Sequence, residues 1–125
     1  MATNSGIRAA MHKIVERSAI IGHASPMDSK ILLEAIALRK CVAARYNRMA
    51  VRLAPHILYT RHDELFVDAV TVERDGQPPR EIKLGSFKLA GLTELELAAQ
   101  SFQPTPIFDP AAPKYTDTTL FAVET

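Results

Sequence analysis

The sequence predicts an α+β protein with two N-terminal helices, a small antiparallel β-barrel and an extended Pro-rich C-terminal tail. Apolar residues recur at helical spacing in the first third of the chain. From Arg45 to Lys88, short β-branched and aromatic segments alternate with turn residues, which is typical of a small barrel. After Phe102, four prolines in close succession oppose regular structure.

The length of 125 residues bounds the number of domains. A chain of this size can bury one hydrophobic core but is too short for two cores and a linker. We therefore expect one domain over 1–125, with an N-terminal helix in 1–24, a helix and barrel in 25–103 and a tail in 104–125.

The two helices are predicted from their apolar spacing and their ends. The first is expected over about Ser5–Ile21 and ends at Gly22. The second is expected over about Pro26–Arg39, because Ser25 can cap it and Pro26 suits its first position. A small barrel cannot cover the apolar stripe of the first helix fully, which predicts a homodimer joined partly through Ile7, Met11 and Ile14.

Five short strands are expected in the central stretch, followed by a sixth at Thr93–Leu97, although the spacing of Leu92, Leu95, Ala98 and Ala99 would also suit a helix. In Arg74-Asp75-Gly76-Gln77, the Asp-Gly pair supplies the positive φ angles of a tight hairpin, and Pro78-Pro79 then limits pairing. The hairpin partners are expected to be Leu65–Glu73 and Arg80–Leu84, and Gly85–Gly91 is expected to be a connection. The other strands are expected at Cys41–Tyr46, Met49–Ala54 and Ile57–Thr60, with Pro55 at a ladder end or a bulge.

Motifs of enzymes and metal centres are absent from the sequence. There is no Gly-rich phosphate loop, no His-Glu-x-x-His and no Gly-x-Ser-x-Gly. The four histidines show no ligand spacing, and the one cysteine, Cys41, excludes an internal disulfide and favours a structural role. We therefore expect no catalytic residues, no metal and no cofactor. No apolar segment reaches membrane-span length, so we expect a cytoplasmic protein without a membrane partner.

Charge is unevenly distributed along the chain, although the net charge is only +1. Residues 1–62 hold ten Lys and Arg against three acids, a balance of +7, which leaves −6 for residues 63–125. Such asymmetry indicates either an anion-binding face in the first half or two halves that neutralise each other across the fold or a dimer interface.

Arginine, lysine, histidine and tyrosine are concentrated on the expected barrel. Guanidinium groups bind phosphate in a bidentate manner and tyrosine rings stack on bases, so this composition suits nucleotide or single-strand recognition. The alternative is that these side chains form only the solvated face of a half-exposed sheet. The candidate ligand-binding residues are Arg45, Arg52, His56, Tyr59, Arg80 and Lys83.

The order of several motifs over about residues 30–103 resembles the WYL domain, a bacterial regulatory module. The matching elements are Ala35-Ile36, Arg39, Val42-x-x-x-Tyr46, Pro55-x-x-Leu58, Leu65–Ala69 and Arg80-x-Ile82-Lys83-Leu84. The resemblance implies an Sm/SH3-like barrel preceded by a helix, and a ligand of the nucleic acid or nucleotide class. The triplet that names the family falls at Leu65-Phe66-Val67, and Ser86-Phe87 stands where the family has Arg-Ile.

These observations together predict a non-enzymatic, WYL-like sensing domain. It is expected to bind a nucleotide or single-stranded nucleic acid and to signal to a protein partner or transcription regulator. The alternative is a protein-interaction or dimerisation module with no small ligand.

Overall fold

The computed structural model describes residues 26–125, which form one α-helix, six β-strands and two short 3₁₀ helices. The first predicted helix, its proposed dimer contacts and the Ser25 cap lie outside the described residues. In chain order the elements are α2 (Pro26–Leu38), β1 (Lys40–Tyr46), β2 (Met49–Arg61), β3 (Glu64–Arg74), β4 (Leu84–Lys88), η1 (Leu89–Gly91), β5 (Thr93–Ser101), η2 (Pro113–Tyr115) and β6 (Thr119–Ala122).

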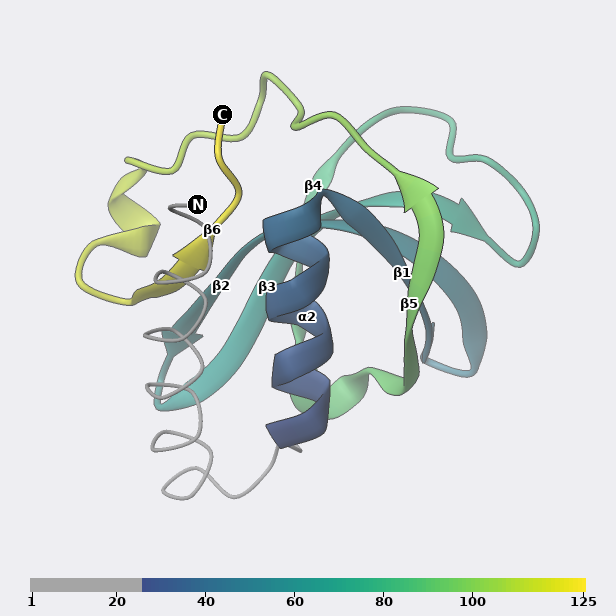
Figure 1. The fold of residues 1–125 in the computed structure, drawn as a ribbon, viewed down its shortest axis with the longest axis horizontal. Coiled ribbons are helices and arrows are strands. Elements are labelled where there is room, and N and C mark those ends of the chain that lie inside the picture. Colours follow the sequence, from purple (N-terminus) through teal and green to yellow (C-terminus); the bar gives the residue numbers. More distant parts are fainter. Residues whose placement is uncertain (1–25) are drawn as a thin grey trace.

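All six strands belong to one antiparallel sheet with the order β4-β3-β2-β1-β5. The long strand β2 pairs with β3 along one side. On its other side it pairs with β1 through Met49–Leu53 and with β6 through Ile57–Tyr59. Figure 1 shows α2 crossing this sheet, where it packs against β1, β2, β5 and β6.

The expectation of a closed Sm/SH3-like barrel is wrong, because β4 and β5 are the two ends of the strand order and do not pair. The sheet is nevertheless curled. Tyr46 of β1 and Phe87 of β4 are separated by β2 and β3, which would place them roughly 14 Å apart in a flat sheet. Their ring centroids are only 5.1 Å apart. The curl brings the two ends toward each other, but an open side remains.

The core lies between α2 and the inner face of the curled sheet. Leu32, Leu33 and Ile36 of α2 are at most 1% exposed, as are Leu53 and Val67 from the central strands. Burying side chains of this size stabilises the fold by about 1.5–3 kcal/mol each. The apolar spacing that predicted the second helix therefore identified residues of the core, and its predicted bounds agree with Pro26–Leu38.

Strand β2 contains a bulge at His56. Pro55 pairs with Ala69 and Ile57 pairs with Asp68, so His56 is the extra residue between two consecutive partners. The sequence predicted that Pro55 ends the ladder or lies at a bulge, and the bulge is correct. The two strands expected on either side of Pro55 are one continuous strand.

The hairpin prediction was correct at its turn and wrong in its second strand. Asp75 and Gly76 have φ of 48° and 80°, and Arg74 and Gln77 exchange both backbone hydrogen bonds. Beyond this bridge the chain leaves the sheet and returns as β4 at Leu84–Lys88, where Gly85–Lys88 was expected to be a connection. Because proline cannot donate a ladder hydrogen bond, Pro78-Pro79 keep residues 78–83 out of the sheet.

The C-terminal segment is more ordered than the extended tail that the prolines predicted. It contains η2, and β6 adds a strand to β2. Phe108, Tyr115 and Val123 are buried, whereas Ile107 is 57% exposed. None of the helices in residues 26–125 has the length and apolar character needed to cross a bilayer.

Candidate ligand-binding site

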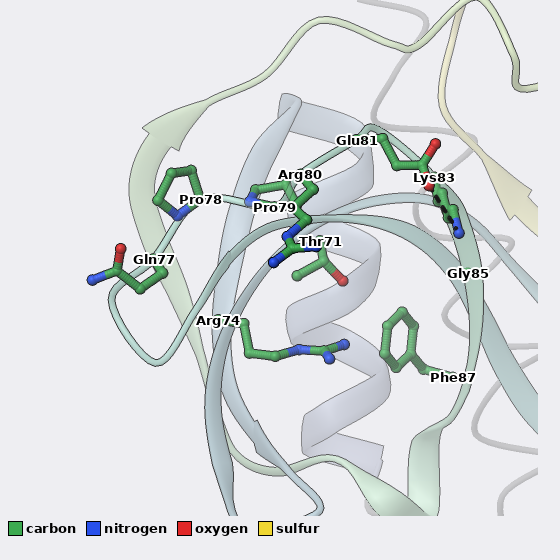
Figure 2. A pocket seen from close by; sticks show the side chains of 10 residues that line it. All are labelled: Thr71, Arg74, Gln77, Pro78, Pro79, Arg80, Glu81, Lys83, Gly85 and Phe87. Atoms are coloured by element: carbon green, nitrogen blue, oxygen red, sulfur yellow. Dashed lines mark ion pairs between the residues drawn. The ribbon is translucent and has the colours of Figure 1, made fainter.

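A pocket of about 480 Å³ lies between the β3–β4 loop and the sheet. Figure 2 shows Arg74, Arg80 and Thr71 directed into the space that the loop and β4 enclose, with the Phe87 ring across from them and Gln77 pointing outward. The volume is within the usual range of roughly 300–1,000 Å³ for small-molecule sites. Its lining residues are Thr71, Arg74, Gln77, Pro78, Pro79, Arg80, Glu81, Lys83, Gly85 and Phe87.

The pocket exists because β4 pairs with only part of β3. The last pair between them is Val70 with Leu84, so the end of β3 from Thr71 to Arg74 has no β4 partner. The prolines of the loop prevent the chain from completing that ladder. Side chains of β3 and the returning loop therefore face each other across an open space.

The floor of the pocket is apolar. Phe87 is 7% exposed and makes an edge-to-face contact with Tyr46 at an interplanar angle of 82°. Next to it, Gly85 leaves space above the ring, since a Cβ atom there would lie 3.5 Å from Cε1 of Phe87. This small residue therefore helps to give the pocket its depth.

The upper part of the pocket is cationic. Three of its side chains are basic, Arg74, Arg80 and Lys83, against one acid, Glu81. Lys83 is paired with Glu81 at 3.1 Å in an exposed contact that contributes little to stability. Among the described residues, the guanidinium groups of Arg74 and Arg80 enter no ion pair. Two arginines with unused donors above an apolar floor can bind an anion that carries an apolar or planar body.

Three other hollows are less suited to such a ligand. The one beside Arg52 has a volume of only 140 Å³. The other two, of about 430 and 380 Å³, share Arg39 and Glu124. The Arg39 guanidinium already donates a 2.9 Å hydrogen bond to the Glu124 carbonyl oxygen, so part of its donor capacity is used. The β3–β4 pocket is therefore the candidate site.

Two of the six residues predicted from the sequence, Arg80 and Lys83, line this pocket. Arg45 and Arg52 lie elsewhere, on β1 and β2, and each has an acidic partner. Arg45 is 3.5 Å from Glu94, and Arg52 donates to Glu73 at 2.8 Å. In both pairs an arginine of the first half meets an acid of the second half, which is the mutual neutralisation that the charge distribution allowed.

The other two predicted residues, His56 and Tyr59, are each 1% exposed and lie in the core, away from any external ligand. His56 hydrogen-bonds Ala54 and Thr105 through its two ring nitrogens. Burial, followed by a hydrogen bond to Asp68, raises the pKa of Tyr59 to about 12. Rings of the C-terminal segment cover both side chains, with Phe102 and Phe108 against His56 and Tyr115 against Tyr59.

Asp68 is the centre of a second polar cluster. Its carboxylate accepts hydrogen bonds from Tyr59, Tyr115 and Lys114, and Lys114 also donates to Ser86 at 3.2 Å. Buried networks in which the polar groups are satisfied stabilise and specify a fold. This cluster attaches η2 to the sheet. Within residues 26–125, no group of three His, Cys, Asp or Glu side chains could hold a metal ion.

The sequence reasoning missed Arg74, Thr71 and Phe87. Arg74 could have been found, because it directly precedes the Asp-Gly turn and must lie at the mouth of the hairpin. Phe87 was assigned to a connection, so its contact with the strands was not foreseen.

Comparisons of the chain with models of protein families, with curated proteins and with solved structures gave no match. Over residues 26–125, the fold and the pocket define a small curled sheet with one packed α-helix and a cationic cavity that has an apolar floor.

Proposed function

We propose that this protein is a non-enzymatic ligand-binding domain whose site is the β3–β4 pocket. The ligand is a small organic anion of the nucleotide class, as a free nucleotide or as the end of a single strand. The observation that carries the proposal is the pair of unpaired guanidinium groups, Arg74 and Arg80, above the floor that Phe87 and Gly85 form.

The chemistry of the pocket supports this ligand class. Phosphate oxygens suit the fork of donors on arginine, and a planar base suits an apolar floor edged by prolines. The sequence resemblance to the WYL domain points to the same class. The sensing role also needs an output, which we propose to be a protein partner or transcription regulator.

A titration tests the proposal directly. A nucleotide panel and a short labelled single strand are titrated against the wild-type protein at low and moderate salt. Binding through phosphate must weaken as salt rises, because counterions compete for the protein. Loss of a charge-assisted contact costs about 1.5–3 kcal/mol, so Arg74→Ala and Arg80→Ala should each weaken binding roughly ten- to a hundredfold.

Two matched arginine variants locate the site. Arg45→Ala and Arg52→Ala remove guanidinium groups that already have acidic partners, and they should leave the affinity within about twofold of wild type. If these variants weaken binding while Arg74→Ala and Arg80→Ala do not, the ligand lies across β1 and β2 and the pocket assignment is wrong. If the wild type binds no probe in a salt-sensitive way, the interaction-module alternative replaces the sensing function.

A further inference from the structure

His56 connects the sheet to the C-terminal segment through side chain and backbone. As the extra residue of the bulge in β2, it does not take part in the regular pairing with β3. Its carbonyl oxygen accepts a 2.7 Å hydrogen bond from the amide of Val123. Its ring reaches the segment between β5 and η2, where the amide of Thr105 lies 3.0 Å from Nε2.

The hydrogen bonds fix the protonation state of the ring. Because Nε2 accepts from an amide N–H, it carries no proton, and Nδ1 must then be the protonated nitrogen that donates to the Ala54 carbonyl oxygen at 2.8 Å. The ring is enclosed by Phe102 and Phe108, with centroid distances of 5.0 and 5.3 Å. The closed arrangement therefore requires a neutral imidazole.

Protonation of Nε2 is incompatible with this arrangement. The added N–H would point at the N–H of Thr105, so an attraction would become a contact between two donors in a buried site. Burial lowers the pKa of His56, an effect that the Ala54 hydrogen bond opposes only in part. In any state that exposes the ring to water, the pKa of His56 returns to its ordinary value of 6.5.

We propose that His56 is a latch that holds residues 102–109 on the sheet at neutral pH and releases them under mildly acidic conditions. The released stretch is bounded on both sides. β5 ends at Ser101, and on the far side Lys114 and Tyr115 remain attached to Asp68. Opening exposes the Phe102 and Phe108 rings without dissolving the sheet.

The charged groups near the His56 ring make no hydrogen bond to it. On the elements that pack against it, these groups are Arg39 before β1, Glu124 after β6, Asp109 beyond Phe108, and the Asp68–Lys114 pair between β3 and η2. Neither ring nitrogen bonds to any of them, because both are used by Ala54 and Thr105. Hydrogen bonds lower the pKa of Asp68, so its carboxylate remains ionised at the pH at which an exposed imidazole becomes protonated.

Amide hydrogen exchange measured by NMR tests the latch. The protection factor of the Thr105 amide should fall between pH 7.5 and 5.5, by at most about tenfold, since the open state takes up one proton below pH 6.5. At neutral pH it should already be lower than that of Val67 in the centre of β3, because the segment opens without the sheet. Equal protection of these two amides at every pH would show that they open as one unit, and would overturn the proposal.

Two substitutions separate His56 from the other titrating groups. His56→Gln retains a side-chain acceptor but cannot titrate in this range, so the fall in Thr105 protection should disappear. His62→Asn is the matched control, because His62 is exposed in the β2–β3 turn with φ of 51°, which asparagine tolerates. It should leave the fall unchanged.

One measurement on the wild type needs no variant. The NMR signals of the His56 ring should report the Nδ1-protonated tautomer at neutral pH and a pKa below 6.5. A ring that titrates at 6.5 or above, or the opposite tautomer, would contradict the latch even if His56→Gln failed to fold. None of these measurements involves the β3–β4 pocket, so the latch and the ligand-binding proposal stand or fall separately.

Discussion

The hydroxyl of Tyr59 donates a 2.7 Å hydrogen bond to Oδ1 of Asp68, a carboxylate that is 1% exposed in β3. The other oxygen, Oδ2, accepts from Nζ of Lys114 at 2.8 Å and from the hydroxyl of Tyr115. Burial alone would raise the pKa of Asp68, but hydrogen bonds from Lys114, Tyr115, Tyr59 and Ser86 lower it below its ordinary value. One ionised side chain thus joins β2, β3 and η2.

Removing this charge should destabilise the protein strongly. Asp68→Asn eliminates the ion pair with the half-exposed Lys114 and leaves one acceptor oxygen for three donors around a buried side chain, so we expect a loss of about 3 kcal/mol in the free energy of unfolding, measured by urea denaturation. The matched control is Asp63→Asn, an exposed turn residue with φ of 61°, which should change stability by less than about 0.5 kcal/mol. Equal stability of the two variants would contradict the role of Asp68.

The same carboxylate should contribute to the acid sensitivity of the fold. Because the pKa of Asp68 is lowered in the folded state, its contribution is fully present above the ordinary value of 3.8 and is lost as the pH falls through the folded pKa. The stability difference between wild type and Asp68→Asn should therefore be constant near neutral pH and shrink below about pH 3.8. Denaturant titrations at several pH values measure this difference, and a gap that widens in acid would have the wrong sign.

A charge placed in the core of β3 should unfold the protein. Val67 is fully buried, and Val67→Asp puts a carboxylate there without a partner, at a cost of several kcal/mol, comparable with the total stability of a small domain. Circular dichroism should show loss of the folded signal or a sharply lowered melting temperature. Ile82→Asp makes the same kind of change at a side chain that is 66% exposed, and it should melt like wild type.

The hairpin turn should require glycine at position 76. Its φ of 80° is unfavourable for residues with a Cβ atom, so Gly76→Val should cost roughly 1–2 kcal/mol. Gly85→Ala is the control, because φ there is ordinary and the added Cβ would make normal contact with Phe87. If both variants unfold at the same urea concentration as wild type, the turn conformation is not what position 76 requires.

Filling the pocket should weaken ligand binding without unfolding the sheet. Gly85→Val places a branched side chain over the Phe87 ring in a strand, where valine is favoured. We expect at least a tenfold loss of affinity for any probe that binds wild type, with a melting temperature within a few degrees. Unchanged affinity in a folded Gly85→Val protein would place the ligand outside the pocket.

Local rules predicted much of the fold. Helical spacing identified α2, and the demand for positive φ at Asp75-Gly76 identified the turn. The second hairpin strand was misplaced because alternation in Arg80–Leu84 and in Leu84–Lys88 is equally plausible locally, and only pairing with Val67 and Ala69 selects the latter. The prediction of a closed barrel was wrong for the same reason, because no local sequence pattern shows whether β4 and β5 pair.

Only two of the six ligand-binding residues predicted from the sequence line the candidate pocket. Arg80 and Lys83 follow the two prolines and line the pocket. His56 and Tyr59 are buried because β2 is covered on both faces beyond Ala54, with Phe108 and Tyr115 of the C-terminal segment against them, and no local pattern reveals that cover. Two of the partners of Asp68, Lys114 and Tyr115, lie 46 and 47 positions further along the chain, a separation that local patterns do not reveal.

The bulge also makes His56 an insertion that the sheet itself does not need. Pro55 and Ile57 pair with consecutive residues of β3, so a chain lacking His56 would keep the same pairs, and Leu58 and Tyr59 would keep their faces. What such a chain would lose are the acceptors for Val123 and Thr105. A single extra residue thus lets β2 keep its pairs with β3 and also hydrogen-bond the C-terminal segment, without disturbing the alternation on either side.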